Sequence, residues 1–399
     1  MQVAVTPSGP VQGRRVAVTG LGAISCAGVG ANALWQALQS STPPASKRIG
    51  EFDASHLGGP KELRRFDPFT LYGLMAAQEA WDQSGLEGPI LDGGSLVTTG
   101  IGGLQTVLEQ FRVLSEKGPD RVSPFMVPMM MPNAATAAVS MRFGLGGPAE
   151  TVTTACAAGT HAIGNAARLI SSGRCSVVVA GGAEAVMVPL SEAGFKNMTA
   201  LSNEEISRPF DVKRNGFVMG EGAGILILED WDHALARGAT ILAEVIGAAS
   251  TADAHHITAP DPEGNGAVRC MELALSDAGI GPEDVSHVNA HGTSTPLNDL
   301  GESVAMKRVF TNGVPPITSL KGHLGHSLSA AGALEGVASV LTLLNQSIPP
   351  TAGTTEVDPE IGLDVVLGSP REAELEVVLS NSFGFGGHNG SVIFRRFHP

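Results

Sequence analysis

The sequence predicts an α/β protein whose strands are covered by helices on both faces. Stretches typical of strands alternate with stretches of helical period along the chain. The strand-like stretches at 176–180 and 225–228 are continuously apolar and lack the alternation that marks a strand with one face in water. With 43% hydrophobic and 16% charged residues, a chain of 399 residues can also bury a large core.

The elements of the first half are expected to begin at Arg14. Residues 1–13 contain two prolines and no helical period, which predicts a flexible lead-in. A strand over 16–19 should end at Gly20, and a helix should follow at 33–39. The further expected elements are a strand at 95–99, a helix at 104–114, a strand at 152–154, a helix at 157–170 and strands at 175–180 and 224–229.

A second series of similar make-up begins near residue 240. Its expected strands lie at 242–248, 285–289, 317, 377–379 and 391–394, and its helices at 266–278, 299–309 and 330–344. We therefore expect two halves, residues 14–240 and 241–399. VTGLGAIS at 18–25 and EVIGAAST at 244–251 are faintly alike, which hints at a duplication. No linker rich in Gly, Ser or Pro separates the halves, so we expect one compact body.

Charge and cysteine content narrow the class of protein. The 25 Lys and Arg residues against 39 Asp and Glu give a net charge of −14, which argues against a nucleic-acid-binding surface. The four cysteines lie far apart without a CxxC pair, which is typical of a reducing compartment, so we expect a cytoplasmic protein. No uninterrupted apolar stretch reaches the ~18 residues of a membrane span.

Several common kinds of site are not supported by the motifs. Gly20-Leu21-Gly22 follows a predicted strand, but Ser25 stands where a dinucleotide fingerprint needs its third glycine. The sequence contains neither a GxSxG elbow nor a GxxxxGK[ST] loop. Its paired histidines lack further ligands at zinc-like spacing, so we expect no metal site.

Cys156 lies where the strand predicted at 152–154 meets the helix predicted at 157–170, among small residues. At the start of a helix, free backbone N–H groups and the helix dipole favour an anion, which predicts a lowered pKa for this thiol. The same N–H groups could hold an oxyanion. Cys156 is therefore a candidate nucleophile. Its alternative role is that of a small buried hydrophobe, the role we expect for Cys26, Cys175 and Cys270.

Two histidines could serve such a nucleophile. His291, in NAHGTSTP, follows an apolar strand, and ligands of α/β proteins gather at the carboxyl ends of strands. His326, in KGHLGHS, precedes the helix expected at 330–344. For either residue, a structural histidine satisfied within the core is the alternative.

A glycine-rich segment near the end of the chain, NSFGFGGHNG at 381–390, places four glycines around Phe383 and Phe385. Glycine lets the backbone approach a ligand closely, and the two rings are large enough to line or block a tunnel. A plain turn with core aromatics is the alternative.

Together these segments resemble the β-ketoacyl-acyl carrier protein synthases, especially the elongating type II branch of fatty acid synthesis. The resemblance runs from Arg14 to Phe397 and rests on eight motifs in the same order: VAVTGLGAIS, GIGGLQTVLEQ, KGPDRVSPFMVPMMMPNAA, TACAAGTHAIGNAARLI, SRPFDVKRNGFVMGEGAG, VNAHGTSTPLND, KGHLGHSLSAAGALE and NSFGFGGHNG. It implies a five-layered, thiolase-like αβαβα fold built from two similar halves, usually as a homodimer.

The resemblance also implies a reaction in two stages, with no cofactor. Cys156 would take an acyl chain from a carrier-protein thioester, and malonyl-carrier protein would lose CO₂ so that its carbanion attacks the acyl-enzyme. By motif position, His291 and His326 would stabilise the enolate, Lys321 would orient His326, and Thr293 and Thr295 would contact the malonyl unit. The N–H groups of Cys156 and Phe385 would form the oxyanion hole, and Phe383 and Phe385 would act as gates. Val107 would line the acyl pocket, and Glu335 would be a buried supporting carboxylate.

The implied partner is an acyl carrier protein. Such carriers are acidic, so docking on an acidic chain needs a local basic patch, which the resemblance places at Lys61, Arg64, Arg65, Lys117 and Arg121. A solvated run of charge is the alternative. We expect a homodimer, or else a heterodimer with a related chain-length subunit, and neither nucleic acid nor membrane as partner.

Three other functions stay open from the sequence. They are the ketosynthase subunit of a type II polyketide or polyene pathway, a non-catalytic chain-length partner, and a thiolase. Cys156 argues against the chain-length partner, and a thiolase needs a second catalytic cysteine in a C-terminal glycine-rich motif, where none stands. The departures from the family pattern are the short region 41–63, Cys26, Asn215, His323 and His388. They concern the acyl preference and the pathway more than the reaction.

Overall fold

Long apolar strands form the centre of the structure, a computed structural model that describes residues 13–398. The lead-in expected at 1–13 therefore lies, apart from Gly13, outside the described residues. The elements of the first half are β1 (Val16–Ser25), β2 (Gly28–Val29), α1 (Ala31–Leu38), α2 (Pro60–Leu63), α3 (Pro68–Ser84), β3 (Gly94–Thr98), α4 (Leu104–Lys117), α5 (Met126–Met130), α6 (Ala134–Phe143), α7 (Ala158–Ser171), β4 (Val177–Glu184), α8 (Pro189–Asn197), β5 (Gly222–Asp230) and α9 (Trp231–Ala236).

The second half follows without an intervening linker. Its elements are β6 (Ala243–Ala252), α10 (Asn265–Ala278), β7 (His287–Asn289), α11 (Pro296–Val309), β8 (Ile317–Thr318), α12 (Lys321–Leu324), α13 (Ser329–Asn345), β9 (Ser347–Ile348), β10 (Arg371–Glu372), β11 (Val377–Gly384) and β12 (His388–Arg396).

The strands of the two halves are paired in the same pattern. In the first half the order is β1-β5-β4-β3, with two antiparallel pairings followed by a parallel one. In the second half β6-β12-β11-β7 repeats this sequence of pairings, and β8 adds a further parallel strand. A short pairing of β1 with β6 joins the two half-sheets. The repeated topology agrees with the faint internal likeness of β1 and β6, although the division at residue 240 stays a prediction.

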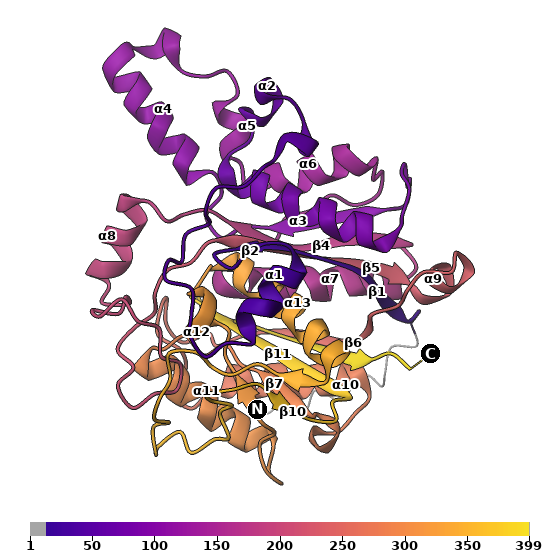
Figure 1. The fold of residues 1–399 in the computed structure, drawn as a ribbon, viewed down its shortest axis with the longest axis vertical. Helices are drawn as coiled ribbons and strands as arrows, with labels where there is room; N and C mark the ends of the chain where they lie inside the picture. Colours follow the sequence, from indigo (N-terminus) through magenta and orange to yellow (C-terminus); the bar gives the residue numbers. More distant parts are fainter. Residues whose placement is uncertain (1–12, 399) are drawn as a thin grey trace, which may run out of the picture.

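Helices cover both half-sheets and separate them (Figure 1). α3 and α6 pack on the outer face of the first half-sheet, α7 and α13 lie between the two, and α10 covers the outer face of the second, with α11 against it. The central helix α13 is buried along nearly its whole length, and its sequence is accordingly mostly apolar, with Glu335 as its single charged residue. The five layers confirm the predicted αβαβα architecture.

Several predicted strands differ from the observed ones, and two of the differences have a clear physical cause. β1 does not end at Gly20 but continues to Ser25, because Gly20 and Gly22 serve as contact points for α3 and not as a turn. Residues 152–154 form no strand. The hydroxyl of Thr136 accepts from the backbone N–H of Val97 and donates to its carbonyl, so the free edge of β3 is already occupied there.

No helix among residues 13–398 is both long enough and apolar enough to cross a bilayer.

Candidate active site

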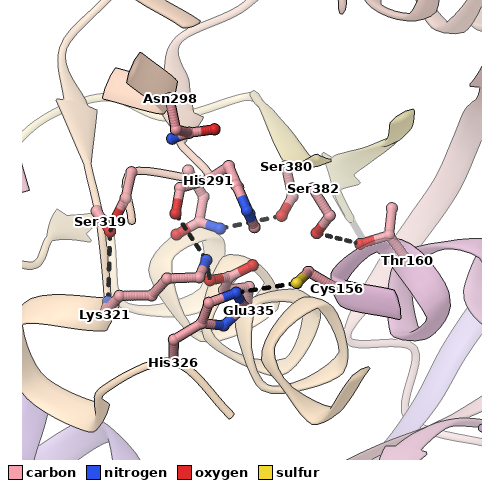
Figure 2. Close-up of polar contacts among 12 residues, drawn as sticks. Cys156, Thr160, His291, Asn298, Ser319, Lys321, His326, Glu335, Ser380 and Ser382 are labelled. Atoms are coloured by element: carbon pink, nitrogen blue, oxygen red, sulfur yellow. Dashed lines mark hydrogen bonds and ion pairs between the residues drawn. The ribbon is translucent and has the colours of Figure 1, made fainter. Parts of the chain in front are cut away.

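Cys156 sits in a 3₁₀ turn, Ala155–Ala157, that leads directly into α7. Ala155 has a left-handed φ of 49°, an uncommon conformation for a residue with a side chain and one that clusters at functional sites. The Cys156 sulfur lies 3.1 Å from Nε2 of His326 (Figure 2). A Cβ atom on Gly384 would lie only 3.0 Å from the backbone N of Cys156, so glycine lets β11 approach the nucleophile.

Burial raises the pKa of the Cys156 thiol to about 11, although the charge of Lys321 and the backbone N–H of Phe385 act in the opposite direction. The lowered pKa predicted from the sequence is therefore wrong. The helix start is covered by the surrounding chain, and removal from water disfavours the thiolate more than the local dipoles favour it. The resting thiol is neutral, and His326 is placed to take its proton.

The two histidines lie together beside this sulfur, with ring centroids 5.5 Å apart and an interplanar angle of 83°. Burial lowers the pKa of both far below the ordinary value, and the charge of Lys321 lowers both further, so both imidazoles are neutral. His291 follows β7, as predicted, and the two oxygens of Glu302 accept from the backbone N–H groups of His291 and Gly292, each at 2.8 Å. This carboxylate fixes the loop that carries the histidine.

Lys321 and Glu335 form an ion pair of 2.5 Å beneath the histidines, and both side chains are almost completely buried. The Lys321 ammonium also donates to the backbone carbonyl of His291 at 2.7 Å. This arrangement differs from the expected one, since no hydrogen bond joins Lys321 to His326 within the described residues. Lys321 is tied to the His291 loop and influences His326 through its charge. Glu335 is buried, as the resemblance implied, and its supporting role stays a prediction.

A cavity of about 420 Å³ opens onto Cys156, His291 and His326. Among its other lining residues are Thr293, Thr295, Phe383 and Phe385, together with Phe195, Phe217 and Leu328. The hydroxyls of Thr293 and Thr295 are 2.9 Å apart, and Thr295 also caps α11. The ring of Phe217 meets that of His326 edge-on at 5.2 Å, and Phe383 meets His291 at 5.9 Å. The reacting groups thus lie in a mostly apolar chamber.

Six of the predicted site residues lie elsewhere. Val107 is half-buried on α4 and does not line the cavity. The residues expected to dock a carrier, Lys61, Arg64, Arg65, Lys117 and Arg121, are all exposed. Figure 1 shows α2 and α4 at the opposite end of the view from α11, whose first residues border the cavity. None of the five basic residues lines the cavity.

Sequence reasoning missed several contributors to the site. Phe217 and Leu328 stand in quoted motifs, SRPFDVKRNGFVMGEGAG and KGHLGHSLSAAGALE, but were assigned no role, and Phe195 lies outside the motifs. Glu302 lies on α11, 11 residues after His291 in the chain. Only the folded structure shows that its carboxylate accepts from the backbone of the loop that carries His291.

The remaining cysteines lie apart from this chamber. Cys26, Cys175 and Cys270 do not line the cavity, and burial raises the pKa of each. A thiolase would need a second cysteine here, so the geometry does not favour that alternative. Within residues 13–398 no three His, Cys, Asp or Glu side chains are grouped so that they could hold a metal ion.

A cysteine beneath two neutral histidines, at the centre of five αβαβα layers, defines a condensing enzyme of the thiolase-like class. Comparison with known proteins identifies the family. Residues 39–234 match the β-ketoacyl synthase N-terminal domain and residues 242–355 the corresponding C-terminal domain. The chain belongs to the β-ketoacyl synthase family, which confirms the predicted class of acyl-transferring enzyme.

Individual relatives are similar over almost the full chain. A protein of Synechocystis named 3-oxoacyl-[acyl-carrier-protein] synthase 2 is 44% identical over 409 aligned residues, covering 96% of this chain and 98% of its own. Among solved structures, the ishigamide ketosynthase/chain length factor superposes with a TM-score of 0.91 at 33% identity, covering 97% of this chain and all of the other. A type II polyketide acyl-carrier protein in complex with its ketosynthase superposes with a TM-score of 0.89, also at 33% identity, over 97% of this chain and all of that one.

Proposed function

We propose that this protein is an elongating β-ketoacyl-acyl carrier protein synthase of fatty acid synthesis. It would condense a malonyl group on a carrier protein with an acyl chain held on Cys156. The observation that carries the proposal is the 3.1 Å contact of the Cys156 sulfur with His326, with the neutral ring of His291 in the same chamber.

In the first stage the thiol of Cys156 passes its proton to His326, and the sulfur attacks the carbonyl carbon of the acyl-carrier thioester. The N–H groups of Cys156 and Phe385 hold the negative oxygen that forms. The bond to the carrier sulfur then breaks, and His326 returns the proton to that leaving thiolate. The acyl group is now a thioester of Cys156, as nucleophilic catalysis with a ping-pong order requires.

In the second stage the bond between the malonyl methylene and its carboxylate breaks and releases CO₂. The electron pair enters the thioester carbonyl as an enolate, which N–H groups of His291 and His326 stabilise. For this His326 carries its proton on Nε2, whereas it accepts from Cys156 in the other tautomer, with the proton on Nδ1. Donation by neutral imidazoles in a water-poor chamber needs no base and no cofactor. The enolate carbon then attacks the acyl carbonyl, and the bond to Cys156 breaks with its electron pair going to sulfur. The Cys156 thiolate takes up one proton from water, which balances the loss of CO₂ from a carboxylate. Thr293 and Thr295 contact the malonyl unit beside its departing carboxylate.

A ketosynthase subunit of a type II polyketide pathway is the second candidate. It is supported by the two solved structures at 33% identity, whose names refer to such assemblies. The relative at 44% identity supports fatty acid elongation. A non-catalytic chain-length partner is not favoured, because the nucleophile and both histidines are assembled in one cavity.

We also propose that an acyl carrier protein docks through Lys61, Arg64, Arg65, Lys117 and Arg121. A net charge of −14 repels an acidic carrier at a distance, so attraction must come from this local group. Substituting these five basic residues by glutamine should raise KM for a carrier-bound thioester but not for the same acyl group on a small thiol. The rise in KM relative to the wild type should shrink at high salt. An equal change in both would contradict docking at this surface.

Intact-protein mass spectrometry tests the reaction. Mixing with acyl-carrier protein should add one acyl mass to the wild type and none to Cys156→Ala, whose melting temperature should stay within a few degrees because little buried volume is lost. His291→Ala should still be acylated, but its malonyl decarboxylation should fall about 10²- to 10³-fold, the usual effect of removing one oxyanion donor. A wild type that gains no mass, or an acylated Cys156→Ala, would end the proposal.

A further inference from the structure

His161 is a buried histidine on α7 that the reaction described above does not use. Its ring joins two separate segments of the site. Nδ1 lies 2.7 Å from the hydroxyl of Thr154, and Nε2 lies 3.0 Å from the backbone carbonyl of Asn389. Because a carbonyl oxygen can only accept, Nε2 carries the proton and Nδ1 accepts from Thr154. Burial lowers the pKa of His161, which agrees with this neutral form.

The two segments that His161 joins each carry one half of the proposed oxyanion hole. Thr154 precedes Ala155, whose left-handed backbone sets the direction of the Cys156 N–H. Asn389 pairs with Phe383 in the β11–β12 hairpin, whose turn carries the N–H of Phe385. The distance between the two N–H groups therefore depends on how α7 is held against this hairpin.

Two glycines show how closely these segments approach each other. A Cβ atom on Gly390 would lie 2.9 Å from the His161 ring, and one on Gly384 would lie 3.0 Å from the backbone N of Cys156 and from the carbonyl oxygen of Thr154. The hairpin thus contacts the nucleophile turn and the histidine at adjacent points, and neither contact has room for a side chain.

We propose that His161 is a positioning residue that sets the geometry of the oxyanion hole by linking Thr154 to Asn389. The inference rests on the proposed function, since it assigns the Cys156 and Phe385 N–H groups to that hole. A hole widened by about 1 Å stabilises the developing oxyanion poorly, so removing the link slows acyl transfer more than it weakens binding.

The experiment compares two reactions of the same sulfur in His161→Ala, Thr154→Val and the double variant. Acyl transfer from acyl-carrier protein forms an oxyanion, whereas alkylation by iodoacetamide forms none. We expect each single variant to lower the acylation kcat about 10- to 100-fold, with KM and the alkylation rate changed less than threefold. The double variant should be no slower than the slower single variant, because both remove one link.

Two matched variants separate positioning from folding. Thr154→Ser keeps the hydroxyl and should keep the acylation rate. Arg168→Met removes a different hydrogen bond from α7 to the sheet, that of Arg168 with the carbonyl of Ala248, and should leave acylation unchanged. Thr154 is only partly buried, so its variants should fold even if His161→Ala does not.

Acylation of Thr154→Val at the wild-type rate, additive effects in the double variant, or an equal fall in acylation and alkylation would each overturn the inference. Failure of the wild type itself to become acylated would instead reject the proposed function.

Discussion

At Cys156, burial and hydrogen bonding act against each other. Burial raises the pKa of the thiol to about 11, and the nearby imidazoles are kept neutral by the same burial. A neutral thiol in contact with a neutral imidazole can pass a proton only as the sulfur attacks, so reactivity is confined to a bound substrate. The chamber protects the nucleophile from modification in its resting state.

Alkylation of Cys156 by iodoacetamide should therefore rise about tenfold per pH unit from pH 7 to pH 10, because only the thiolate reacts and roughly one thiol in 10,000 is ionised at pH 7. Peptide-level mass spectrometry distinguishes Cys156 from Cys26, Cys175 and Cys270. A rate that levels off between pH 6 and pH 8 would show a thiolate already present at neutral pH.

The buried ion pair of Lys321 and Glu335 is a second place where single side chains matter, here for the free energy of unfolding. Lys321→Met should lower the free energy of unfolding by about 3–5 kcal/mol, since it leaves a buried carboxylate without its partner. Combining it with Glu335→Gln should be less destabilising than the sum of the two single changes. Urea denaturation measures both effects.

The exposed pair of Arg371 and Asp364 provides the control, and Arg371→Ala should lower stability by no more than about 1 kcal/mol. Strict additivity of the Lys321 and Glu335 changes would mean that the two groups do not interact in solution.

Among the described residues, the closest approach between two elements that depends on glycine is that of β1 to α3. A Cβ atom on Gly22 would lie 1.9 Å from the carbonyl oxygen of Ala76, and one on Gly20 would lie 2.1 Å from that of Ala80. These glycines let a helix lie directly on the strand. The sequence already excluded a dinucleotide fingerprint here, because Ser25 replaces its third glycine, and the spacing of Gly20 and Gly22 reflects helix-on-sheet packing.

Gly22→Ala should therefore lower the free energy of unfolding by about 3 kcal/mol or more, because the backbone of α3 has to move. Gly194→Ala is the matched change on α8, where a Cβ meets no atom within 4 Å, and it should stabilise by about 0.5–1 kcal/mol through helix propensity. Thermal melting compares the two. Equal melting temperatures would contradict the packing argument.

Over the chain as a whole, apolar side chains are left exposed on the lobe formed by α4 and α5. Phe111 is 66% and Val127 58% exposed there, and Figure 1 shows α4 projecting from the layered body. Large apolar side chains exposed on one projecting lobe favour an interaction site there. It is the surface we assign to the predicted dimer.

Analytical ultracentrifugation of the wild type should accordingly show a dimer, and Phe111→Asp with Val127→Asp should convert it to a monomer, because two charges would be buried without partners. Leu91→Asp changes a residue that is 81% exposed elsewhere on the surface and should leave the dimer intact. A monomeric wild type would contradict the assignment.

The five layers followed from the resemblance, and the helices α3 and α6 were not predicted. Local patterns of the sequence were sufficient for the order and type of most other elements and for selecting Cys156, His291 and His326, which lie around one cavity. These features depend on neighbouring residues, through hydrophobic period and motif, so they survive without coordinates. Three features depend instead on spatial distances between residues far apart in the chain: the pKa of the Cys156 thiol, the partners of Lys321 and the approach of Gly384 to the nucleophile. Cys156 and His326, for example, are 170 residues apart in the chain but in contact in the fold. Packing sets those distances, and burial and contact geometry therefore had to come from the folded structure.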